Sequence, residues 1–205
     1  VKITLRDDRY FSNGKKITMD DLWASIYRAA GDYTTATWDK YFKDCDIKVE
    51  GNTITFTHKN YNINFMQTMS GVTFCVMPKE ICEKYPVTGG EVQPNGLLRG
   101  GKCEIYVNES ADAIGSGPYK LSAWIEEEFT LVRNDKYVSI PNEGAVGVAK
   151  EAKCYLDSIT WQLNKDSASR TAATLAGDYD IGSVQSEMVD TAKAQGIKIR
   201  SAGTT

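Results

Sequence analysis

The segment at positions 115–121 reads Gly-Ser-Gly-Pro-Tyr-Lys-Leu and fixes the backbone more firmly than any other stretch of this 205-residue chain. Glycine adopts backbone conformations that other residues avoid, so the chain can turn sharply here before the aromatic residue begins a strand. A phosphate-binding loop would need a helix directly after its glycines, whereas proline followed by tyrosine favours a strand. We therefore expect a structural turn and no nucleotide site.

Two later segments are equally distinctive. Residues 133–137 read Arg-Asn-Asp-Lys-Tyr, and residues 170–181 read Arg-Thr-Ala-Ala-Thr-Leu-Ala-Gly-Asp-Tyr-Asp-Ile. The second segment predicts a short helix that reaches Ala176, followed by a strand at 179–181. Neither segment contains a catalytic pattern, so the sequence favours a protein that carries a ligand over one that transforms it.

The charge balance excludes one class of partner. Lys and Arg together number 24, Asp and Glu number 27, and the net charge is −3. Nucleic-acid binding needs clustered basic residues, so this balance gives no case for it. No run of about 18 apolar residues is present, so we predict no membrane-spanning helix. The chain has neither a leader sequence nor an initiating Met, so we interpret it as a piece of a longer protein. Its 205 residues are enough for one large domain or two small ones.

The first half of the chain alternates short strands and helices. Alternating residues at 2–6 predict a strand, and Asn13-Gly14 predicts a tight turn. Thr18 is placed to cap a helix that ends at Gly31, because its hydroxyl can accept the backbone N–H of Asp21. The remaining expectations are a helical segment at 38–43, a hairpin of strands 47–50 and 53–58, a helix at 62–70, an apolar strand at 72–77, a helix at 79–84 after Pro78, and an exposed, glycine-rich loop at 86–101.

The second half predicts a partly parallel sheet. Expected here are strands at 119–125 and 129–133, a loop at 139–150, a strand at 156–163, a helix capped by Ser167 or Ser169, strands at 179–181 and 197–199, and a helix at 184–195. Strands that alternate with helices need crossover connections, which place parallel strands in one sheet. The predicted fold class is therefore mixed α/β, with helices flanking a mixed sheet.

Five segments together resemble the family 5 extracellular solute-binding proteins, the peptide- and nickel-capturing subunits of ABC importers. The segments are 3–21, with Ser-Asn-Gly-Lys and Thr-Met-Asp-Asp; 76–79, Val-Met-Pro-Lys; 115–121; 133–137; and 171–181. They follow the family's order over nearly the whole chain. Residues 133–138 depart from the family pattern, because the proline and the tryptophan of its Arg-Asn-Pro-x-Tyr-Trp block are missing. That departure affects local packing near Tyr137 and leaves the resemblance as a whole intact.

The resemblance implies a periplasmic-binding-protein-like class II fragment. Residues 1–112 resemble the small, hairpin-rich extra domain of the family, and residues 113–205 resemble part of its first lobe. A distal lobe would belong to the remainder of the parent chain, and most ligand contacts would lie outside these residues. The resemblance further implies an oligopeptide or similar small solute as ligand, an ABC permease at the membrane as partner, no cofactor, and a periplasmic or extracellular location with a lipid anchor or by secretion.

Five cysteines occur without a Cys-x-x-Cys pair, so a zinc site has little support. Cys82 and Cys103 flank the loop rich in glycine and proline, which a disulfide would restrain. Spacing alone does not fix connectivity, so buried free thiols are the other interpretation. An odd number of cysteines leaves at least one free thiol in a monomer.

Catalytic residues are hard to find. His58 is the only histidine, and its position at the end of a hairpin strand favours a structural role. The run of three glutamates at 126–128 is typical of a solvated hairpin tip. We predict that the protein is not an enzyme. A hydrolase or transferase domain remains an alternative, as does a ligand-sensing domain that reuses the same fold.

Two residues are candidates for ligand contact. Tryptophan combines a large apolar surface with one donor that needs a partner. Trp38 is flanked by polar residues and is the tryptophan expected at a surface or cleft edge, while the other three are expected in the core. Arg170 opens the predicted helix at the third distinctive segment, where an ion pair between structural elements competes with ligand contact as its role.

Overall fold

The computed structural model describes residues 1–32, 37–60, 62–71, 74–103, 110–139 and 154–200. The chain divides into two compact units: the first comprises Val1–Trp124 and Thr130–Ile159, and the second comprises Ile125–Phe129 and Thr160–Thr205. The predicted boundary between positions 112 and 113 lies inside the first unit. A backbone hydrogen bond crosses this boundary, from Ser12 N–H to Gly115 O at 2.8 Å.

The first unit contains a three-stranded sheet of order β1-β3-β2. The strands are β1 (Lys2–Thr4), β2 (Cys45–Glu50) and β3 (Thr53–His58), and both pairings are antiparallel. Ile54 is the partner of Ile3 on one side and of Val49 on the other. The predicted strand and hairpin are confirmed, since alternating β-branched residues around Gly51-Asn52 specify them locally.

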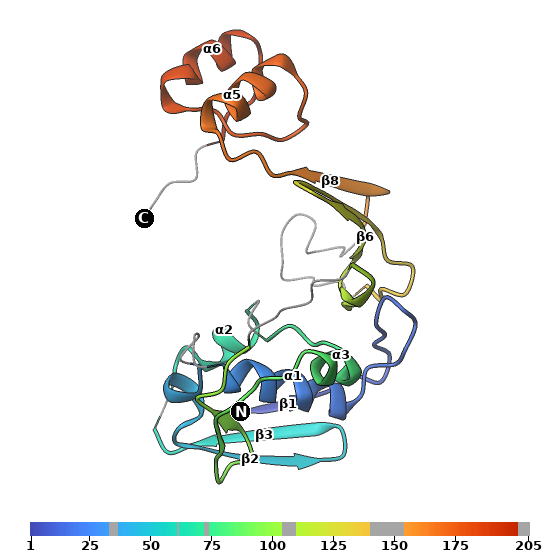
Figure 1. Ribbon diagram of the computed structural model, residues 1–205, viewed down its shortest axis with the longest axis vertical. Helices are drawn as coiled ribbons and strands as arrows, with labels where there is room; N and C mark the ends of the chain where they lie inside the picture. The colour runs from blue at the N-terminus through green and yellow to red at the C-terminus, as the bar shows by residue number, and fades with distance from the viewer. Residues whose placement is uncertain (33–36, 61, 72–73, 104–109, 140–153, 201–205) are drawn as a thin grey trace. The chain divides into compact units, whose positions relative to one another are not determined.

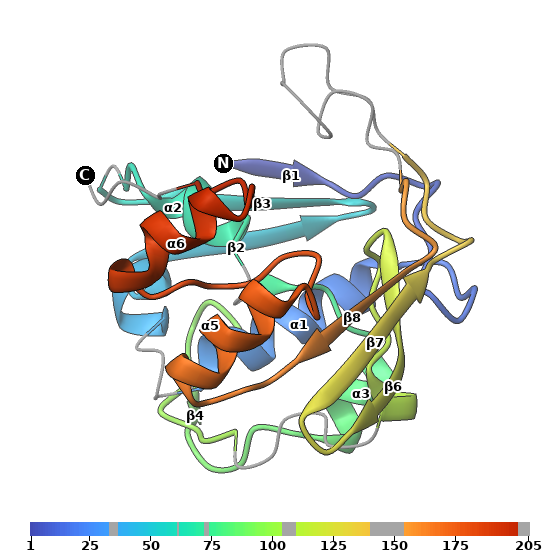
Figure 2. The same ribbon diagram turned by 90° about the horizontal axis from the view of Figure 1, so that it is seen from above.

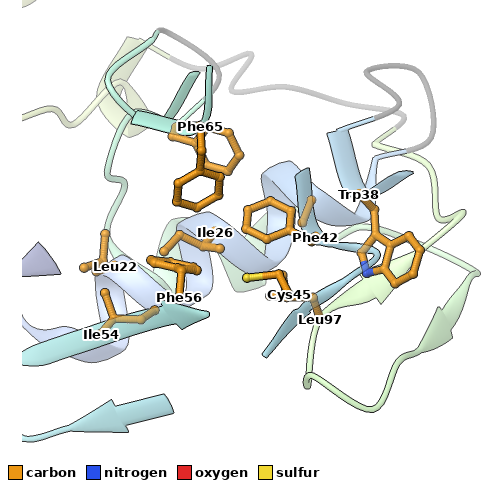
Figure 3. Close-up of a cluster of buried hydrophobic side chains, with 11 residues drawn as sticks. Leu22, Ile26, Trp38, Phe42, Cys45, Ile54, Phe56, Phe65 and Leu97 are labelled. Carbon is orange, nitrogen blue, oxygen red and sulfur yellow. The ribbon is translucent and has the colours of Figure 1, made fainter. Parts of the chain in front are cut away.

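Helices cover one face of this sheet, where α1 and α2 lie on the same side (Figure 1). They are α1 (Met19–Gly31) and α2 (Phe65–Met69), and the short π-helix η2 (Trp38–Phe42) lies between α1 and β2 in the chain. Phe42 lies at the centre of their packing, with its ring 5.9 Å from that of Phe65 and 6.2 Å from that of Phe56 (Figure 3). The buried cluster consists of Leu22, Ile26, Ala30, Trp38, Phe42, Cys45, Ile54, Phe56, Phe65, Phe74 and Leu97.

Asp21 connects the start of α1 to the start of α3 (Lys79–Lys84). Its carboxylate accepts the backbone N–H of Thr18 at 2.8 Å and the backbone N–H of Lys79 at 2.8 Å. Thr18 also donates its hydroxyl to this carboxylate and accepts the N–H of Asp21, which completes a capping box. One turn later, Ser25 accepts the N–H of Met77 at 2.9 Å. The Thr-Met-Asp-Asp and Met-Pro-Lys segments are therefore one hydrogen-bonded unit.

Asn134 holds the glycine–proline turn in a similar way. The Asn134 amide donates to Gly117 O at 2.7 Å, and its oxygen accepts the N–H of Lys136 at 3.0 Å. The side chain is 3% exposed, so both bonds are made away from water. The two distinctive segments around Gly117 and Asn134 thus form one contact. Neither Gly115 nor Gly117 has a positive φ, so the expected need for a glycine-specific backbone conformation is wrong here.

The glycine-rich segment at 86–101 was expected to be an exposed loop, and this prediction is wrong. It forms the two-residue strands β4 (Glu91–Val92) and β5 (Leu98–Arg99), which pair antiparallel. Leu97 is completely buried and Leu98 is 5% exposed. Leu98 packs where α1 ends, because a Cβ at Gly31 would lie 3.1 Å from its side chain. A few apolar residues thus anchor a segment whose composition resembles a loop.

A second sheet has the order β6-β7-β8 (Figure 2). Its strands are β6 (Tyr119–Ile125), β7 (Glu128–Arg133) and β8 (Ser158–Gln162). The division into two units passes through these strands. Glu126 and Glu127 form the connection between β6 and β7, and Glu126 has a φ of 51°, a left-handed conformation that such tight hairpin connections need. The glutamates are thus at a hairpin tip, as expected.

The second unit contains the helical end of the chain. α5 (Ser167–Ala176) is capped by Asp166, which accepts the N–H of Ser169 at 2.7 Å, so neither predicted serine is the cap. Gly177 ends α5 in the left-handed conformation, with a φ of 83°. The short 3-10 helix η5 (Ser186–Met188) leads into α6 (Val189–Ala194). The first unit also has a 3-10 turn, η4 (Ser110–Asp112).

Three predicted strands are not formed. Residues 74–77, 179–181 and 197–199 lie outside all strands, and residues 72–73 lie outside the described part of the chain. In the first of these segments, Met77 bonds to the Ser25 side chain instead of to a neighbouring strand. Ile181 is 94% exposed, so this apolar residue does not mark a buried strand. The mixed α/β class is confirmed, but the predicted crossover connections are absent from the described residues, and the loop predicted at 139–150 falls almost entirely outside them.

All five cysteines are free thiols, and Cys82 and Cys103 are both buried. Burial raises the pKa of each of these two thiols, and the positive charge of Arg28 on α1 opposes the rise at both. Both thiols therefore lie near the same guanidinium. Burial also raises the pKa of the Cys45 thiol, to about 11. The disulfide between Cys82 and Cys103 stays a prediction.

We expect Asp21→Asn to lower the free energy of unfolding by about 1–2 kcal/mol, because an amide can accept only one of the two backbone N–H groups that this buried side chain accepts. Urea unfolding followed by circular dichroism measures the loss. Asp20→Asn is the matched control. That carboxylate is exposed and lies 3.3 Å from Lys79 Nζ, so the control should lose less than about 1 kcal/mol. Equal losses for the two variants would contradict the tethering role of Asp21.

We expect oxidised glutathione to join Cys82 to Cys103, reducing one glutathione disulfide to two thiols. Two of the five cysteines should then escape alkylation after unfolding, and a linked peptide should appear in a non-reduced digest. The loop of about 20 residues that closes should add roughly 3 kcal/mol of stability. Cys82→Ser should abolish the linked peptide, while Cys45→Ser should not. Alkylation of all five thiols after oxidation would show that the pairing is wrong.

Candidate functional site

The first unit has a cavity of about 430 Å³ beside the end of α1. Its walls come from three places: the last turn of α1, the start of η2, and the β4–β5 segment. A cavity of this volume lies within the range of small-molecule sites. The lining residues are Ala30, Asp32, Trp38, Asp39, Gly90, Glu91, Gln93, Arg99 and Gly100.

Trp38 forms the aromatic wall of this cavity. The side chain is 7% exposed and stands at the edge of the buried cluster, with Phe42 and Leu97 toward the interior (Figure 3). Within the described part of the chain, its indole Nε1 has no hydrogen-bond partner. Trp38 therefore belongs to the core and to the cavity at once. Trp38 was expected at a surface or cleft edge; it lines the cavity but is buried in the core cluster, and its contact with ligand stays a prediction.

Trp23 packs against the core as expected, but the two remaining tryptophans differ from expectation. Trp124 is 58% exposed and Trp161 is 53% exposed, although both were expected in the core. Trp161 stacks on Phe129 in the second unit, with ring centres 5.9 Å apart and an interplanar angle of 9°. Stacking reduces the apolar area in contact with water without burying either ring.

Arg99 occupies the face of the Trp38 ring. Its guanidinium carbon lies 4.9 Å from the ring centre, and its Nη2 donates to Asp39 Oδ1 at 2.8 Å. Both members of this ion pair are about half exposed, at 50% for Arg99 and 52% for Asp39. An exposed pair of this kind contributes on the order of 1 kcal/mol or less, so the guanidinium is held weakly.

Acidic side chains dominate the rest of the lining. Asp32, at the C-terminal end of α1, is 4% exposed, while Glu91 on β4 is exposed. With Asp39, the cavity has three carboxylates against one guanidinium. The cavity is therefore negative, and its chemistry suits a cationic group.

Glycines allow the segment that contains β4 and β5 to fold tightly on itself. A Cβ on Gly101 would lie 2.4 Å from Val87 Cγ1, and a Cβ on Gly90 would lie 2.6 Å from Arg99 O. Gly101 also forms a parallel bridge to Asp32. Sequence reasoning missed Arg99 and Glu91 because the segment that contains them was interpreted as a loop, and it did not consider Asp32 at the end of α1. The available signal was the apolar pair Leu97-Leu98 in the middle of that segment.

A second cavity of about 270 Å³ lies beside His58 in the first unit. His58 Nε2 donates to Tyr41 O at 3.0 Å, and its ring centre is 4.4 Å from that of Phe65. Both ring contacts hold the end of β3 against its neighbours. The structural role expected for His58 is therefore consistent with its surroundings.

Arg170 lies in the second unit, where its guanidinium connects the segments on either side of α5. Its Nη1 donates to Asn164 O at 2.6 Å, and its Nε donates to Ser183 Oγ at 3.3 Å. Thr174, one turn along α5, also donates to Ser183 O at 3.3 Å. These bonds are structural, and a contact of Arg170 with ligand stays a prediction.

The described residues contain no group of three or more His, Cys, Asp or Glu side chains able to hold a metal ion. In the same residues, no helix has both the length and the apolar character needed to cross a membrane.

Comparison with known proteins places the chain in a family. The model of the bacterial extracellular solute-binding proteins, family 5 (middle), matches residues 1–205. The oligopeptide-binding protein AppA of Bacillus subtilis strain 168 is 25% identical over 186 residues, which are 89% of this chain and 30% of AppA. The chain thus spans about a third of the length of such a relative.

Solved structures with the same fold are named for different solutes. Listeria monocytogenes OppA bound to peptide is 22% identical, with a TM-score of 0.65 over 94% of this chain and 36% of that one. The nickel ABC transporter protein from Bacillus halodurans is also 22% identical, with a TM-score of 0.61 over 94% of this chain and 33% of that one. The periplasmic-binding-protein-like fold class is therefore confirmed, and the chain belongs to the family 5 bacterial extracellular solute-binding proteins.

Proposed function

We propose that the chain is part of the substrate-binding component of an ABC importer and takes part in capturing an oligopeptide or a similar small solute. The observation that carries this proposal is the family model, which matches all 205 residues. The relative AppA is named as an oligopeptide-binding protein, which favours peptide over nickel as the solute. The solute is delivered to a permease in the membrane.

Capture takes place by closure of two lobes around the solute. In this proposal residues 1–112 belong to the small extra domain and residues 113–205 to part of the first lobe. The distal lobe comes from the remainder of the parent chain. The length of the relatives supports this arrangement, since this chain covers 36% of the peptide-bound OppA.

A carrier needs no nucleophile or general base, and the polar residues of the distinctive segments are used for structure here. Asp21, Asn134 and Arg170 all bond to backbone groups of neighbouring segments. We therefore propose that the protein is not an enzyme. Family members work outside the cytoplasmic membrane, and we propose the same location for this protein, with a lipid anchor or by secretion.

We expect the parent protein, with all chain that flanks residues 1–205, to become more compact when an oligopeptide pool is added. Closure brings the two lobes together, so the radius of gyration in small-angle X-ray scattering should fall, and calorimetry should record heat of binding. A nickel chelate and an oligosaccharide provide the comparison. The proposal would be contradicted if none of the three ligands produced either heat of binding or compaction. Compaction with the nickel chelate alone would keep the receptor function and reject peptide as the solute.

A further inference from the structure

The cavity beside Trp38 already contains a cation supplied by the chain. Arg99 lies 4.9 Å from the centre of the Trp38 ring and pairs with Asp39 at 2.8 Å. A planar guanidinium is attracted to an aromatic face and forms directed bonds to carboxylates. The walls thus have the two features that recognise such a group.

The charge of the cavity exceeds what Arg99 neutralises. Leaving aside Asp32, which has interactions of its own, Asp39 and Glu91 contribute two negative charges, and Arg99 contributes one positive charge. Asp32 is buried with interactions of its own, while Glu91 is exposed on β4. A second cation that entered the cavity would therefore meet a field that favours it.

The shape of the site favours an organic cation over a metal ion. A metal ion needs several ligands that converge on one point, and the described residues contain no such group of three. An organic cation distributes its charge over several N–H donors, so it can reach separated carboxylates. The volume of about 430 Å³ accommodates a group of that size with the rest of a small ligand.

The ion pair that fills the site is exchangeable. Arg99 and Asp39 are each about half exposed, so water already competes for their contact. The Arg99 side chain is long and flexible, and it can leave the Trp38 face when a better-placed guanidinium takes over the ring and Asp39. Trp38, by contrast, is fixed in the core.

We propose that this cavity is a binding site for the guanidinium group of a small ligand, which stacks on Trp38 in place of Arg99 and pairs with Asp39 and Glu91. The site lies entirely within the first unit. It goes beyond the proposed capture of solute by two lobes and stands whether or not that proposal is correct.

The 205-residue chain allows a direct test by nuclear magnetic resonance. The indole N–H signal of Trp38 is identified by its disappearance in Trp38→Phe. N-acetyl-arginine amide should shift this signal in a saturable way. N-acetyl-citrulline amide, the neutral analogue of nearly the same shape, should leave it in place. The chemistry of the site thus predicts discrimination by charge.

Variants with opposite expected effects sharpen the test. Arg99→Met removes the competing cation and should strengthen binding of the arginine derivative by about two- to five-fold. Glu91→Gln removes a partner and should weaken binding by roughly two- to five-fold. Glu50→Gln on β2 makes the same change of charge outside the cavity lining and should have no effect. All three side chains are about half exposed or more, so the variants should fold.

Three results would overturn the proposal. The citrulline derivative shifting the signal as strongly as the arginine derivative would show that charge is not recognised. Loss of binding in Arg99→Met would show that Arg99 builds the site and does not compete for it. If Glu91→Gln and Glu50→Gln bound the arginine derivative with equal affinity, Glu91 would have no specific role, and only the overall charge of the protein would matter. If Arg99→Met fails to fold, the proposal is tested by comparing the arginine and citrulline derivatives and by comparing Glu91→Gln with Glu50→Gln.

Discussion

The carboxylate of Asp21 is the contact on which the first unit depends. It accepts backbone N–H groups from Thr18 and from Lys79, which are far apart in the sequence, and it is 7% exposed. The first turns of α1 and α3 are therefore both bonded to the two carboxylate oxygens of Asp21. Because a buried N–H without an acceptor costs about as much as a lost hydrogen bond, neither α1 nor α3 can move away without a penalty. Their fixed positions in turn hold the core against the sheet.

Elements encoded by neighbouring residues were predictable from the sequence. The cap at Thr18, the turn at Gly14 and the hairpin around Gly51 are all confirmed, because each depends on chemistry within a few positions. The strand expected at 72–77 was wrong for the opposite reason. An apolar run predicts burial but does not say what the backbone bonds to, and Met77 bonds to the Ser25 side chain.

Only part of the candidate site could be found in the same way. Trp38 was identified because its side chain is large and its neighbours are polar. Arg99 and Glu91 were missed, since their place in the cavity requires β4–β5 to fold back on α1. That folding depends on the bridge between Gly101 and Asp32 and on the burial of Leu97 in the core cluster, which are contacts between distant residues. Composition alone interprets such a segment as a loop.

The strength of the polar contacts separates structural groups from those able to recognise a ligand. Asn134 makes its bonds in a buried setting, where water cannot replace a lost partner, so engaging a ligand would disrupt the turn at Gly117. The pair of Arg99 and Asp39 is half exposed, and either member can exchange its partner at a cost on the order of 1 kcal/mol. A binding site needs side chains that are held in place and an occupying group that a ligand can displace. In the described residues the cavity beside Trp38 combines both, because its ring is fixed by the core and its cation is not.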